Sequence, residues 1–484
     1  MAQYKSFYKL LESLADKYND KTAVLYDTFE VSYRKLFDDS VKKALHLQHF
    51  DGNRIAIYGP ASYRWIVNLF GTVLAGKDAA LVDFFIPHDI RFKMIEKIDA
   101  DYVLCSTNQY ILSDANGIII NGAENDNVDG LTYNADDVKE GNILLFTAGE
   151  NECDKAVVLT SDNIMSAIGY INAHCNCTED DRVLAQIELS KIFGLLYCLI
   201  WPLSCGACIC VGRGLRHIDA DTYYYDATIL PANPSMAEYL KKIKGFNDNL
   251  KNIIIGGAPC PYHLYECLRD RDINVSSVYG TSESTGCIAI NYDEDGSYEP
   301  FADNTLKLSD DGEILLSGGC VMKGYYNDEV QTERKLKGGY LHTGDYGRIN
   351  SSGRLIITKR NPAIISLPTG EKICRNVINR EIESINGIAE SYIMFYDEKL
   401  IAVISAIDKS EKVDRFKRKI DKYNDKKGYR WEIQKVVLLD MKLPRKDDGS
   451  VDETMKGKVY KQSVSAGTKV DKKGTTITIY YYQE

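Results

Sequence analysis

Short apolar strands alternate with helices through the first part of the chain, and this alternation limits its possible folds more than any other feature. Residues 54–59 read as a strand that ends in glycine, residues 62–75 as a helix, and residues 79–83 as the next strand. Further strands of the same kind are expected at 102–104, 117–120, 227–230 and 252–256. Because parallel strands are joined by crossover helices, this order predicts an α/β fold built on doubly wound sheets.

The composition changes towards the end of the chain. Residues 301–357 are rich in strand formers and glycine turns, which predicts a small β subdomain. Residues 362–484 hold 24 Lys and Arg against 19 Asp and Glu, a net charge of +5, whereas the whole chain carries −10. The difference either arises by chance or marks a mobile cap that meets phosphates or an acidic partner. We expect an N-terminal domain over 1–361 and a small, mobile α+β C-terminal domain over 362–484.

The overall composition excludes several classes of protein. A net charge of −10 argues against a nucleic-acid partner. The longest uncharged run, between Lys191 and Arg213, divides at Pro202 into a buried helix and a buried strand, so we expect no transmembrane segment. Residues 1–16 read as an amphipathic helix and not as an export signal, which predicts a cytoplasmic protein whose 13 cysteines are reduced. The pair Cys205 and Cys208 is interpreted as apolar packing and not as a zinc site.

One glycine turn carries an acidic residue at a spacing that suits a nucleotide. The segment 339–345 ends in Thr343-Gly344-Asp345, with Ile357 twelve positions on and Arg360 three further. A carboxylate held at a turn suits the two hydroxyls of a ribose, and an arginine nearby neutralises a phosphate. Alone, such a turn is typical of an ordinary surface loop.

Two more loops follow apolar strands. Residues 143–145 form a strand that leads into Thr147 and Gly149, with Lys155 after them, and exposed N–H groups with a lysine suit a triphosphate. The intervening residues 150–154 include three carboxylates, so a solvated acidic turn is the competing interpretation. The segment 279–283 combines a tyrosine, a glycine turn, two hydroxyls and Glu283, which suits phosphate oxygens and Mg²⁺ or, equally, a capped helix start.

The order of these motifs resembles the adenylate-forming, or AMP-binding, superfamily, which includes acyl-CoA synthetases, peptide-synthetase adenylation domains and luciferases. The resemblance rests on Gly257-Ala258-Pro259, Tyr279–Glu283, Gly324-Tyr325-Tyr326-Asn327, His342–Arg360 and a terminal Gly457-Lys458. It implies ATP-dependent activation of a carboxylic acid to an acyl-adenylate. The acyl group then passes to a thiol of coenzyme A or of carrier-protein phosphopantetheine.

The resemblance also implies residue roles. Nucleotide contacts are expected from Thr147, Gly149, Lys155, Gly257, Ala258, Pro259, Tyr279, Gly280, Thr281, Ser282, Asp345, Ile357 and Arg360. Catalytic roles are expected for Lys458, Glu283 and Arg360, with Glu283 holding Mg²⁺ and Lys458 bridging the substrate carboxylate and the adenylate phosphate. Gly370 is expected to line the tunnel for the thiol.

Three parts of the chain depart from the family pattern. Pro362 stands at the expected hinge, where proline restricts rotation. Glu150 and Glu152 occupy the phosphate loop, where negative charge opposes a triphosphate. Lys458 follows an apparent insertion, and Lys456 and Lys461 compete for its role.

The sequence restricts the chemical class of the acid substrate in part. Gly194 follows Phe193 where amino-acid-activating members carry an aspartate, so a fatty or aromatic acid is expected, and Lys191 leaves the polarity of the pocket open. Two alternatives remain: a carrier-loading adenylation protein without coenzyme A activity, and a non-catalytic acyl-nucleotide-binding homologue.

Overall fold

The computed structural model describes residues 4–106, 118–121, 132–147, 155–243, 245, 247–293, 295–301, 306–361, 363–396, 398–408, 410–427, 431–439, 442–443 and 451. The chain divides into two compact units. The N-terminal unit comprises residues 1–147, 154–361 and 366–371, and the C-terminal unit comprises 148–153, 362–365 and 372–484. The division into a nucleotide-binding domain and a cap stays a prediction.

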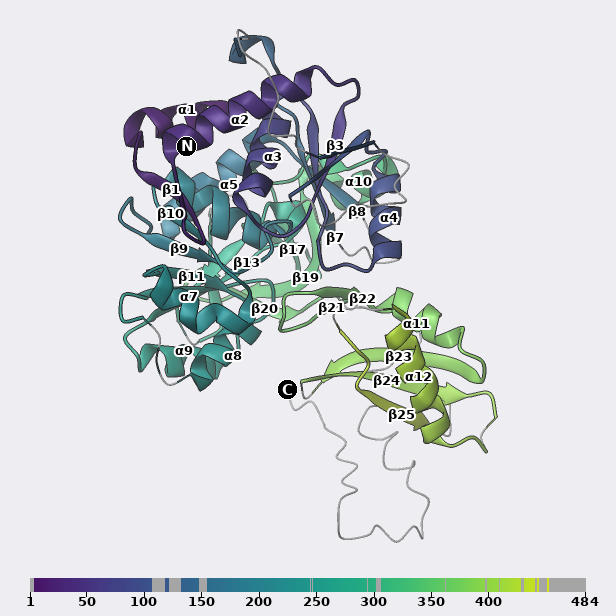
Figure 1. Cartoon of the computed structure of the whole chain (residues 1–484). Coiled ribbons are helices and arrows are strands. Elements are labelled where there is room, and N and C mark those ends of the chain that lie inside the picture. Colours follow the sequence, from purple (N-terminus) through teal and green to yellow (C-terminus); the bar gives the residue numbers. More distant parts are fainter. Residues whose placement is uncertain are drawn as a thin grey trace. The chain divides into compact units, whose positions relative to one another are not determined.

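A seven-stranded sheet forms one layer of the N-terminal unit (Figure 1). Its order is β18 (Gly324–Tyr325), β8 (Lys155–Leu159), β7 (Ile143–Thr147), β4 (Asp78–Leu81), β3 (Arg54–Tyr58), β5 (Tyr102–Cys105) and β6 (Ile118–Asn121). The strands from β7 to β6 are parallel, and β8 and β18 are antiparallel additions at one edge. Central strands such as β3 are buried on both faces, as expected for a parallel sheet covered by helices.

A thirteen-stranded sheet forms the second layer. Its order is β16 (Leu306–Leu308), β17 (Glu313–Leu316), β19 (Leu341–Ile349), β20 (Leu355–Lys359), β15 (Ser297–Pro300), β14 (Ala289–Asn291), β13 (Asn274–Tyr279), β12 (Asn252–Ile255), β11 (Ile229–Ala232), β9 (Arg182–Ala185), β10 (Cys208–Val211), β1 (Thr22–Tyr26) and β2 (Phe29–Ser32). The strands from β13 to β1 are parallel. The strand-rich segment predicted at 301–357 supplies β16, β17 and β19 of this sheet and most of β20, which pairs with β15 next to β14 and the parallel strands.

Helices pack on these sheets. They are α1 (Phe7–Tyr18), α2 (Tyr33–Gln48), α3 (Tyr63–Leu74), α4 (His88–Lys97), α5 (Ser161–His174), α6 (Trp201–Ser204), α7 (Ile218–Tyr224), α8 (Pro234–Lys242), α9 (Tyr262–Arg269) and α10 (Glu329–Lys335), with short helices η1 (Ala135–Asp137), η3 (Leu215–His217), η4 (Ser282–Ser284) and η5 (Lys337–Gly339). Ser62 starts α3 because its hydroxyl accepts a hydrogen bond from the Trp65 N–H at 3.2 Å. The helix predicted over 62–75 is therefore present.

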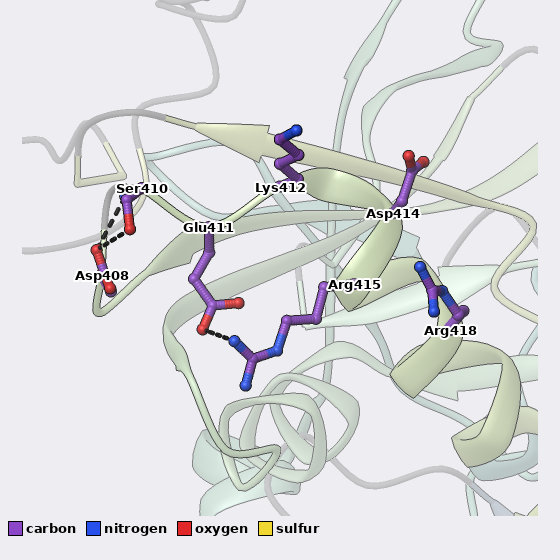
Figure 2. Close-up of a pocket in the computed structure, with 7 residues that line it drawn as sticks. All are labelled: Asp408, Ser410, Glu411, Lys412, Asp414, Arg415 and Arg418. Atoms are coloured by element: carbon purple, nitrogen blue, oxygen red, sulfur yellow. Dashed lines mark hydrogen bonds and ion pairs between the residues drawn. The ribbon is translucent and has the colours of Figure 1, made fainter.

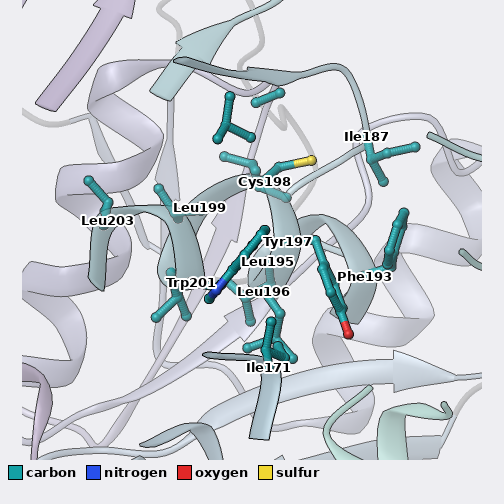
Figure 3. Packing of buried hydrophobic residues seen from close by; sticks show 14 of the residues in the cluster. Ile171, Ile187, Phe193, Leu195, Leu196, Tyr197, Cys198, Leu199, Trp201 and Leu203 are labelled. Atoms are coloured by element: carbon teal, nitrogen blue, oxygen red, sulfur yellow. The ribbon is translucent and has the colours of Figure 1, made fainter. Parts of the chain in front are cut away.

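The core between the sheets includes a buried π-helix, η2 (Gly194–Ile200), which continues into α6. Tyr197 of η2 packs against Phe193 and Trp201, the residues that flank the helix (Figure 3). Every residue of η2 is buried. The sequence predicted a buried helix and strand in this region, and β10 is that strand. π-helices are rare and occur frequently at functional sites, so this element marks a region to examine.

The C-terminal unit has its own small core. Strands β23 (Ile388–Tyr396), β24 (Lys399–Ala406) and β25 (Lys435–Leu439) form one sheet, with helices α11 (Arg375–Glu383) and α12 (Val413–Lys427). Strands β21 (Ile364–Ser366) and β22 (Lys372–Cys374) form a separate pair. Phe416 and Ile420 are the buried residues of α12. The predicted fold class, an α/β domain followed by a small α+β domain, is confirmed.

Two further expectations concern absences. Within the residues that the structure describes, no helix is long and apolar enough to cross a membrane. The same residues contain no group of three or more His, Cys, Asp or Glu side chains arranged to hold a metal ion. Cys208 is buried in the core, and Cys205 is partly buried and packs against it.

Candidate active site

The candidate residues gather at the carboxyl ends of β12 and β13. These two strands are parallel neighbours, so the loops that follow them leave the sheet at the same edge. The first loop carries Gly257-Ala258-Pro259 and the second carries the segment 280–283. Ligands of open α/β sheets bind outside the carboxyl ends of the strands, which makes this edge the expected binding face.

Asp345 is the centre of a buried hydrogen-bond network. Its Oδ2 accepts from the Tyr279 hydroxyl at 2.7 Å and from Arg360 Nη1 at 2.8 Å, and its Oδ1 accepts from the backbone N–H of Asn361 at 2.8 Å. The Asp345 side chain is 7% exposed and that of Arg360 is 37% exposed. A carboxylate accepts about four hydrogen bonds. Among the described residues three are made, so Asp345 can accept about one more.

The turn before Asp345 is held from the neighbouring strand. Glu313 of β17 accepts a hydrogen bond from the Gly344 N–H at 2.8 Å, and its other oxygen lies 2.8 Å from His342 Nδ1. The Thr343 hydroxyl donates to the carbonyl of Ile314 at 2.7 Å. These contacts fix the direction of the Asp345 carboxylate before any ligand binds.

Burial and charge act in opposite directions on this carboxylate. Burial raises the pKa of Asp345, but Arg360 and the hydrogen bonds from Tyr279 and Asn361 outweigh it, so the pKa lies below its usual value. Burial and the Asp345 charge together raise the pKa of the Tyr279 hydroxyl well above its usual value. Asp345 is therefore ionised and Tyr279 is a protonated donor across the neutral range. The Arg360 guanidinium lies over the Tyr279 ring, 4.6 Å from its centre.

Glu283 lies at the junction of the two sheets. Its Oε1 accepts a hydrogen bond from the Tyr325 hydroxyl at 2.8 Å, and its carbonyl accepts from the Met322 N–H at 2.9 Å. The ammonium of Lys155 lies 4.9 Å from the centre of the Tyr325 ring and donates to Gln331 Oε1 at 3.2 Å. Tyr325 thus connects Lys155 of the seven-stranded sheet to Glu283 of the thirteen-stranded sheet.

The loop that carries Glu283 is tightly built. Thr281 caps η4, and the side chains of Thr281 and Ser284 exchange hydrogen bonds with each other's backbone in a capping box. A Cβ on Gly280 would lie 2.2 Å from the backbone of Gly286, so only glycine fits there. The structural interpretation of this segment as a capped helix start holds, and it leaves Ser282 and Glu283 half-exposed at the binding edge.

The phosphate-loop residues are placed in part. Thr147 and Lys155 are opposite each other in the β7–β8 antiparallel pair, which puts both at the base of the same loop. Gly149, with the carboxylates of Glu150 and Glu152, lies outside the described residues, as do the hinge residue Pro362 and the catalytic candidate Lys458. Their predicted roles stay predictions.

Gly370 belongs to a short loop of the N-terminal unit, residues 366–371. Asn233 Nδ2 donates to the Thr369 carbonyl at 2.9 Å, and the Ser235 N–H donates to the Pro368 carbonyl at 3.2 Å. Gly370 lies against Gly257: a Cβ on Gly257 would be 3.3 Å from the Gly370 Cα. Ile357 lies in β20, paired with Gly347, and packs partly buried against the core.

A scan against protein-family models assigns most of the N-terminal unit. Residues 11–326 match the model described as AMP-binding enzyme. The chain belongs to the AMP-binding enzyme family. This match confirms the resemblance that the motifs indicated. The matched segment includes Glu283 and Tyr325 and the site residues that precede them in the chain.

Several relatives of this chain are CoA ligases by name. One, from Mycobacterium tuberculosis, is 3-[(3aS,4S,7aS)-7a-methyl-1,5-dioxo-octahydro-1H-inden-4-yl]propanoyl:CoA ligase, 30% identical over 45% of the chain and 46% of the relative. Another, the 2-succinylbenzoate–CoA ligase of Listeria monocytogenes, is 25% identical over 65% of the chain and 69% of the relative. The chain spans about half the length of several of the curated relatives it matches.

The fold of this chain matches that of a solved enzyme over nearly its whole length. A double mutant of o-succinylbenzoate CoA synthetase from Bacillus subtilis superposes with a TM-score of 0.78 at 20% identity, covering 93% of this chain and 98% of that one. At this identity the likeness establishes the fold alone.

A second family model matches the end of the chain. Residues 437–483 match the PASTA domain model, beginning within β25. No motif of the sequence indicated this family. Lys458 lies inside the matched segment, as do Lys456 and Lys461. The proposal that Lys458 serves the AMP-binding site must therefore be tested separately from the roles of Glu283 and Arg360.

Several residues of the site were not singled out from the sequence. Tyr325 belongs to a motif that was recognised, but no role was given to it. Glu313 and Gln331 carry no local signal, because their contacts depend on strand pairing and on a helix far along the chain. Asn361 contributes a backbone N–H, which no side-chain motif reveals.

The wall behind the site is formed by the start of η2. A Cβ on Gly194 would lie 2.2 Å from the Glu188 carbonyl oxygen, and one on Gly256 would lie 2.5 Å from the Phe193 ring. Lys191 makes an ion pair with Asp83 at 2.8 Å. Burial lowers the pKa of Lys191, but Asp83 outweighs burial and the pKa lies above its usual value. The charge of Lys191 is thus balanced within the protein.

Proposed function

We propose that this protein activates a carboxylic acid with ATP and transfers the acyl group to the thiol of coenzyme A. The proposal rests on two charged networks that lie at one sheet edge. Asp345 pairs with Arg360, and Glu283 is linked to Lys155 through Tyr325. The segment 279–283 joins the two networks. Membership of the AMP-binding family and the CoA ligases among its relatives support it.

The nucleotide is assigned to residues that fit its parts. The remaining acceptor position of Asp345 suits a ribose hydroxyl, and Arg360 beside it suits a phosphate oxygen. The loop 257–259 and Tyr279, at the ends of adjacent strands, frame the adenine. Thr147, Gly149, Lys155, Thr281 and Ser282 bind the phosphates.

A magnesium ion fits the donors near Glu283. A half-exposed carboxylate beside the hydroxyls of Thr281 and Ser282 provides the hard oxygen ligands that Mg²⁺ prefers. When bound, the ion neutralises phosphate charge. Tyr325 orients the Glu283 carboxylate through its hydroxyl, and Lys155 adds a positive charge on the same side.

The reaction needs no nucleophilic side chain. A carboxylate oxygen of the acid attacks the α-phosphorus of ATP, the bond to the β-phosphate oxygen breaks, and pyrophosphate leaves. The thiolate of the acceptor then attacks the acyl carbon, a C–S bond forms, and AMP leaves with the oxygen. The protein contributes positioning and charge stabilisation, to which we assign Arg360 and Lys458.

The acid is assigned to the fatty or aromatic class. An amino acid requires a carboxylate near its α-amino group, and Gly194 has no room for any side chain because of the Glu188 carbonyl. Phe193, packed on Gly256, makes the adjoining surface apolar. The cation of Lys191 is paired with Asp83 and is not reserved for a second anionic group of the acid.

Thioester formation tests the proposal. The protein is incubated with ATP, Mg²⁺, coenzyme A and each acid of a panel of fatty, aryl and amino acids, and acyl-CoA and AMP are quantified. We expect equimolar acyl-CoA and AMP with at least one fatty or aryl acid and none with amino acids. AMP binding without turnover of any acid would contradict the proposal and favour a non-catalytic homologue.

The acidic phosphate loop provides a direct control for that alternative. If the carboxylates at 150–154 oppose the triphosphate, the Glu152→Gly variant gains activity over the wild type. A wild type that is active and unimproved by Glu152→Gly indicates that these charges do not obstruct ATP. Transfer to a phosphopantetheine-bearing carrier, without transfer to coenzyme A, would identify the carrier-loading alternative.

A further inference from the structure

The C-terminal unit has a hollow on its surface, with a volume of about 380 Å³. The charged side chains that line it are Asp408, Glu411, Asp414, Lys412, Arg415 and Arg418 (Figure 2). Three carboxylates stand beside three cations, and Arg415 pairs with Glu411 at 2.5 Å. Because these charges balance, the hollow favours neither an anionic nor a cationic ligand.

A group of cysteines in the N-terminal unit offers more specific chemistry. Cys177 lies in the connection between α5 and β9, and Cys205 is the C-cap of α6, in the turn before β10. Strands β9 and β10 are parallel neighbours, and the Cys208 N–H donates to the Asp181 carbonyl at 2.9 Å. Both connections therefore enter the sheet at the amino ends of the strands. The candidate active site lies at the opposite edge, so these cysteines are separate from it.

Tyr18 of α1 holds the two connections together. Its hydroxyl donates to Oε2 of Glu179, two residues after Cys177, at 2.8 Å. Its ring lies against Gly206, where a Cβ would be 2.4 Å from the ring carbon Cζ. Gly206 has a φ of +82°, so the turn after Cys205 also favours glycine for its backbone. One tyrosine thus fixes the chain beside both cysteines.

The thiols of Cys177 and Cys205 are in direct contact. The Cys177 thiol donates a hydrogen bond to the Cys205 sulfur, and the Cys205 thiol donates to Asn172 Oδ1 at 3.3 Å. Both cysteines are partly buried. The hydrogen bond from Cys177 holds the pKa of Cys205 below its usual value, although burial opposes it, and the same bond raises the pKa of Cys177. Cys205 is therefore the better nucleophile, because the thiolate is the reactive form.

The neighbouring cysteines are less suited to react with Cys205. Cys208 is buried in β10, where its thiol is hydrogen-bonded to that of Cys210. Residues two apart on a strand have Cα atoms ~6.6 Å apart, at the upper end of the range that a disulfide spans. Burial raises the pKa of Cys175 to about 12, which keeps it a thiol. Contact and reactivity together single out Cys177 and Cys205.

We propose that Cys177 and Cys205 form a reversible disulfide when the protein meets hydrogen peroxide. The Cys205 thiolate attacks one peroxide oxygen, the S–O bond forms, the O–O bond breaks, and the leaving hydroxide takes up a proton to become water. The Cys177 thiol then attacks the sulfenic sulfur, the S–S bond forms, and the sulfenic oxygen leaves as a second water with the thiol proton. The two sulfurs together lose two electrons, which reduce the peroxide, and a dithiol such as dithiothreitol reverses the oxidation.

The disulfide clamps one end of the helix that forms the wall behind the candidate site. Cys205 ends α6, and α6 continues η2, which begins at Gly194 beside Phe193. The loop that the disulfide closes, residues 177–205, includes β9, η2 and α6. The covalent bond limits local opening of this segment and constrains the unfolded chain. Oxidation therefore stabilises this part of the N-terminal unit.

Peptide mapping of the full chain tests the pairing. The protein is treated with hydrogen peroxide or kept reduced, its free thiols are alkylated, and non-reducing digestion with mass spectrometry identifies the linked peptides. We expect Cys177 linked to Cys205, with the linkage lost in dithiothreitol. A Cys205–Cys208 linkage, a disulfide between two chains, or oxidation of Cys205 without a partner would overturn the proposal.

Serine variants of four cysteines are the matched set. Cys177→Ser and Cys205→Ser should each abolish the linked peptide, whereas Cys175→Ser and Cys208→Ser should keep it. Circular dichroism confirms that each variant is folded. Loss of the Cys177–Cys205 linkage in a folded Cys175→Ser or Cys208→Ser variant would overturn the assignment of the pair.

Hydrogen exchange measures the clamp without ATP, acid or acceptor, so it is independent of the proposed function. On oxidation of the wild type, amide exchange in residues 194–205 should slow by about threefold or more, and Tm should rise by about 3–10 °C. Neither quantity should change when Cys177→Ser is treated in the same way. Equal exchange and equal Tm in the reduced protein and in protein that carries the disulfide would overturn the clamp.

Discussion

The Asp345 and Glu283 halves of the candidate site are built differently. Asp345 lies within a single sheet, 7% exposed, with a cation and two further donors bonded to it. Glu283 lies where two sheets meet, half-exposed, with a neutral tyrosine hydroxyl as the donor to its Oε1. The first carboxylate is fixed by the protein's own charges. The second carboxylate depends on a contact between the sheets, through the Tyr325 hydroxyl.

This difference predicts different consequences when each half is altered. A change at Glu283 should affect the chemistry and leave stability nearly unchanged. A change at Asp345 should affect both, because removing one member of a buried ion pair leaves the other without compensation. The predictions below probe this contrast in order of decreasing effect.

The largest effect is expected for Glu283→Gln. Removing the charge that we assign to the magnesium ion should slow adenylation about 10²–10³-fold, as does the loss of a group that stabilises transition-state charge. ATP–pyrophosphate exchange measures the rate. Glu333→Gln, an exposed acid of α10, is the matched control. A Glu283→Gln enzyme within threefold of wild type would exclude the role.

The second largest effect is expected for Lys458→Ala, which tests whether a third charged group completes the site. If Lys458 bridges the carboxylate and the phosphate, adenylation should fall by ~10²-fold. Lys469→Ala changes another lysine of the segment that matches the PASTA model. Equal, small effects of the two variants on exchange would assign Lys458 to that segment's own function.

Asp345→Asn should lower stability as well as nucleotide affinity. Replacing a carboxylate that accepts from a cation costs about 1.5–3 kcal/mol of unfolding free energy, measured by urea unfolding against the exposed control Asp310→Asn. Because the pKa of folded Asp345 lies below its usual value, its contribution is present above pH ~4 and is lost as the pH falls further. The difference between wild type and variant should therefore be constant from pH 8 to 5 and shrink in acid. A difference that grows in acid would contradict this account.

The smallest effect is expected for Tyr325→Phe. The variant keeps the ring beneath Lys155 and loses only the hydroxyl bonded to Glu283, a hydrogen bond worth roughly 1 kcal/mol, or about fivefold in kcat/KM. Tyr326→Phe on the next residue is the matched control, since its hydroxyl bonds to exposed Asp99. Equal losses in the two variants would mean that the hydroxyl of Tyr325 does not orient Glu283.

The sequence predicted the parts of the site that are local. The spacing from Asp345 to Arg360 spans one hairpin, β19 and β20, so their ion pair follows from two adjacent strands. The Tyr279–Glu283 motif is a strand end and its turn. Both motifs can be recognised in the sequence because their residues lie on one hairpin or on one strand and its turn.

Contacts between distant elements could not be predicted in the same way. The approach of Tyr325 to Glu283 needs the edge strand β18 to pair with β8, and Glu313 reaches Gly344 because β17 pairs with β19. Gly194 was interpreted by its chemistry, as a missing aspartate, whereas its packing against Glu188 is the physical constraint. Residues 437–483, which match the PASTA model, carry no local motif that indicated this family.

ATP–pyrophosphate exchange tests the central claim most directly, since it reports the first half-reaction without the acceptor. With Mg²⁺ and labelled pyrophosphate, we predict exchange that requires a fatty or aryl acid, is absent with amino acids, and falls at least 10²-fold in Glu283→Gln. No acid-dependent exchange across the panel, in a protein that binds AMP, would contradict the claim that these two networks form a working adenylation site.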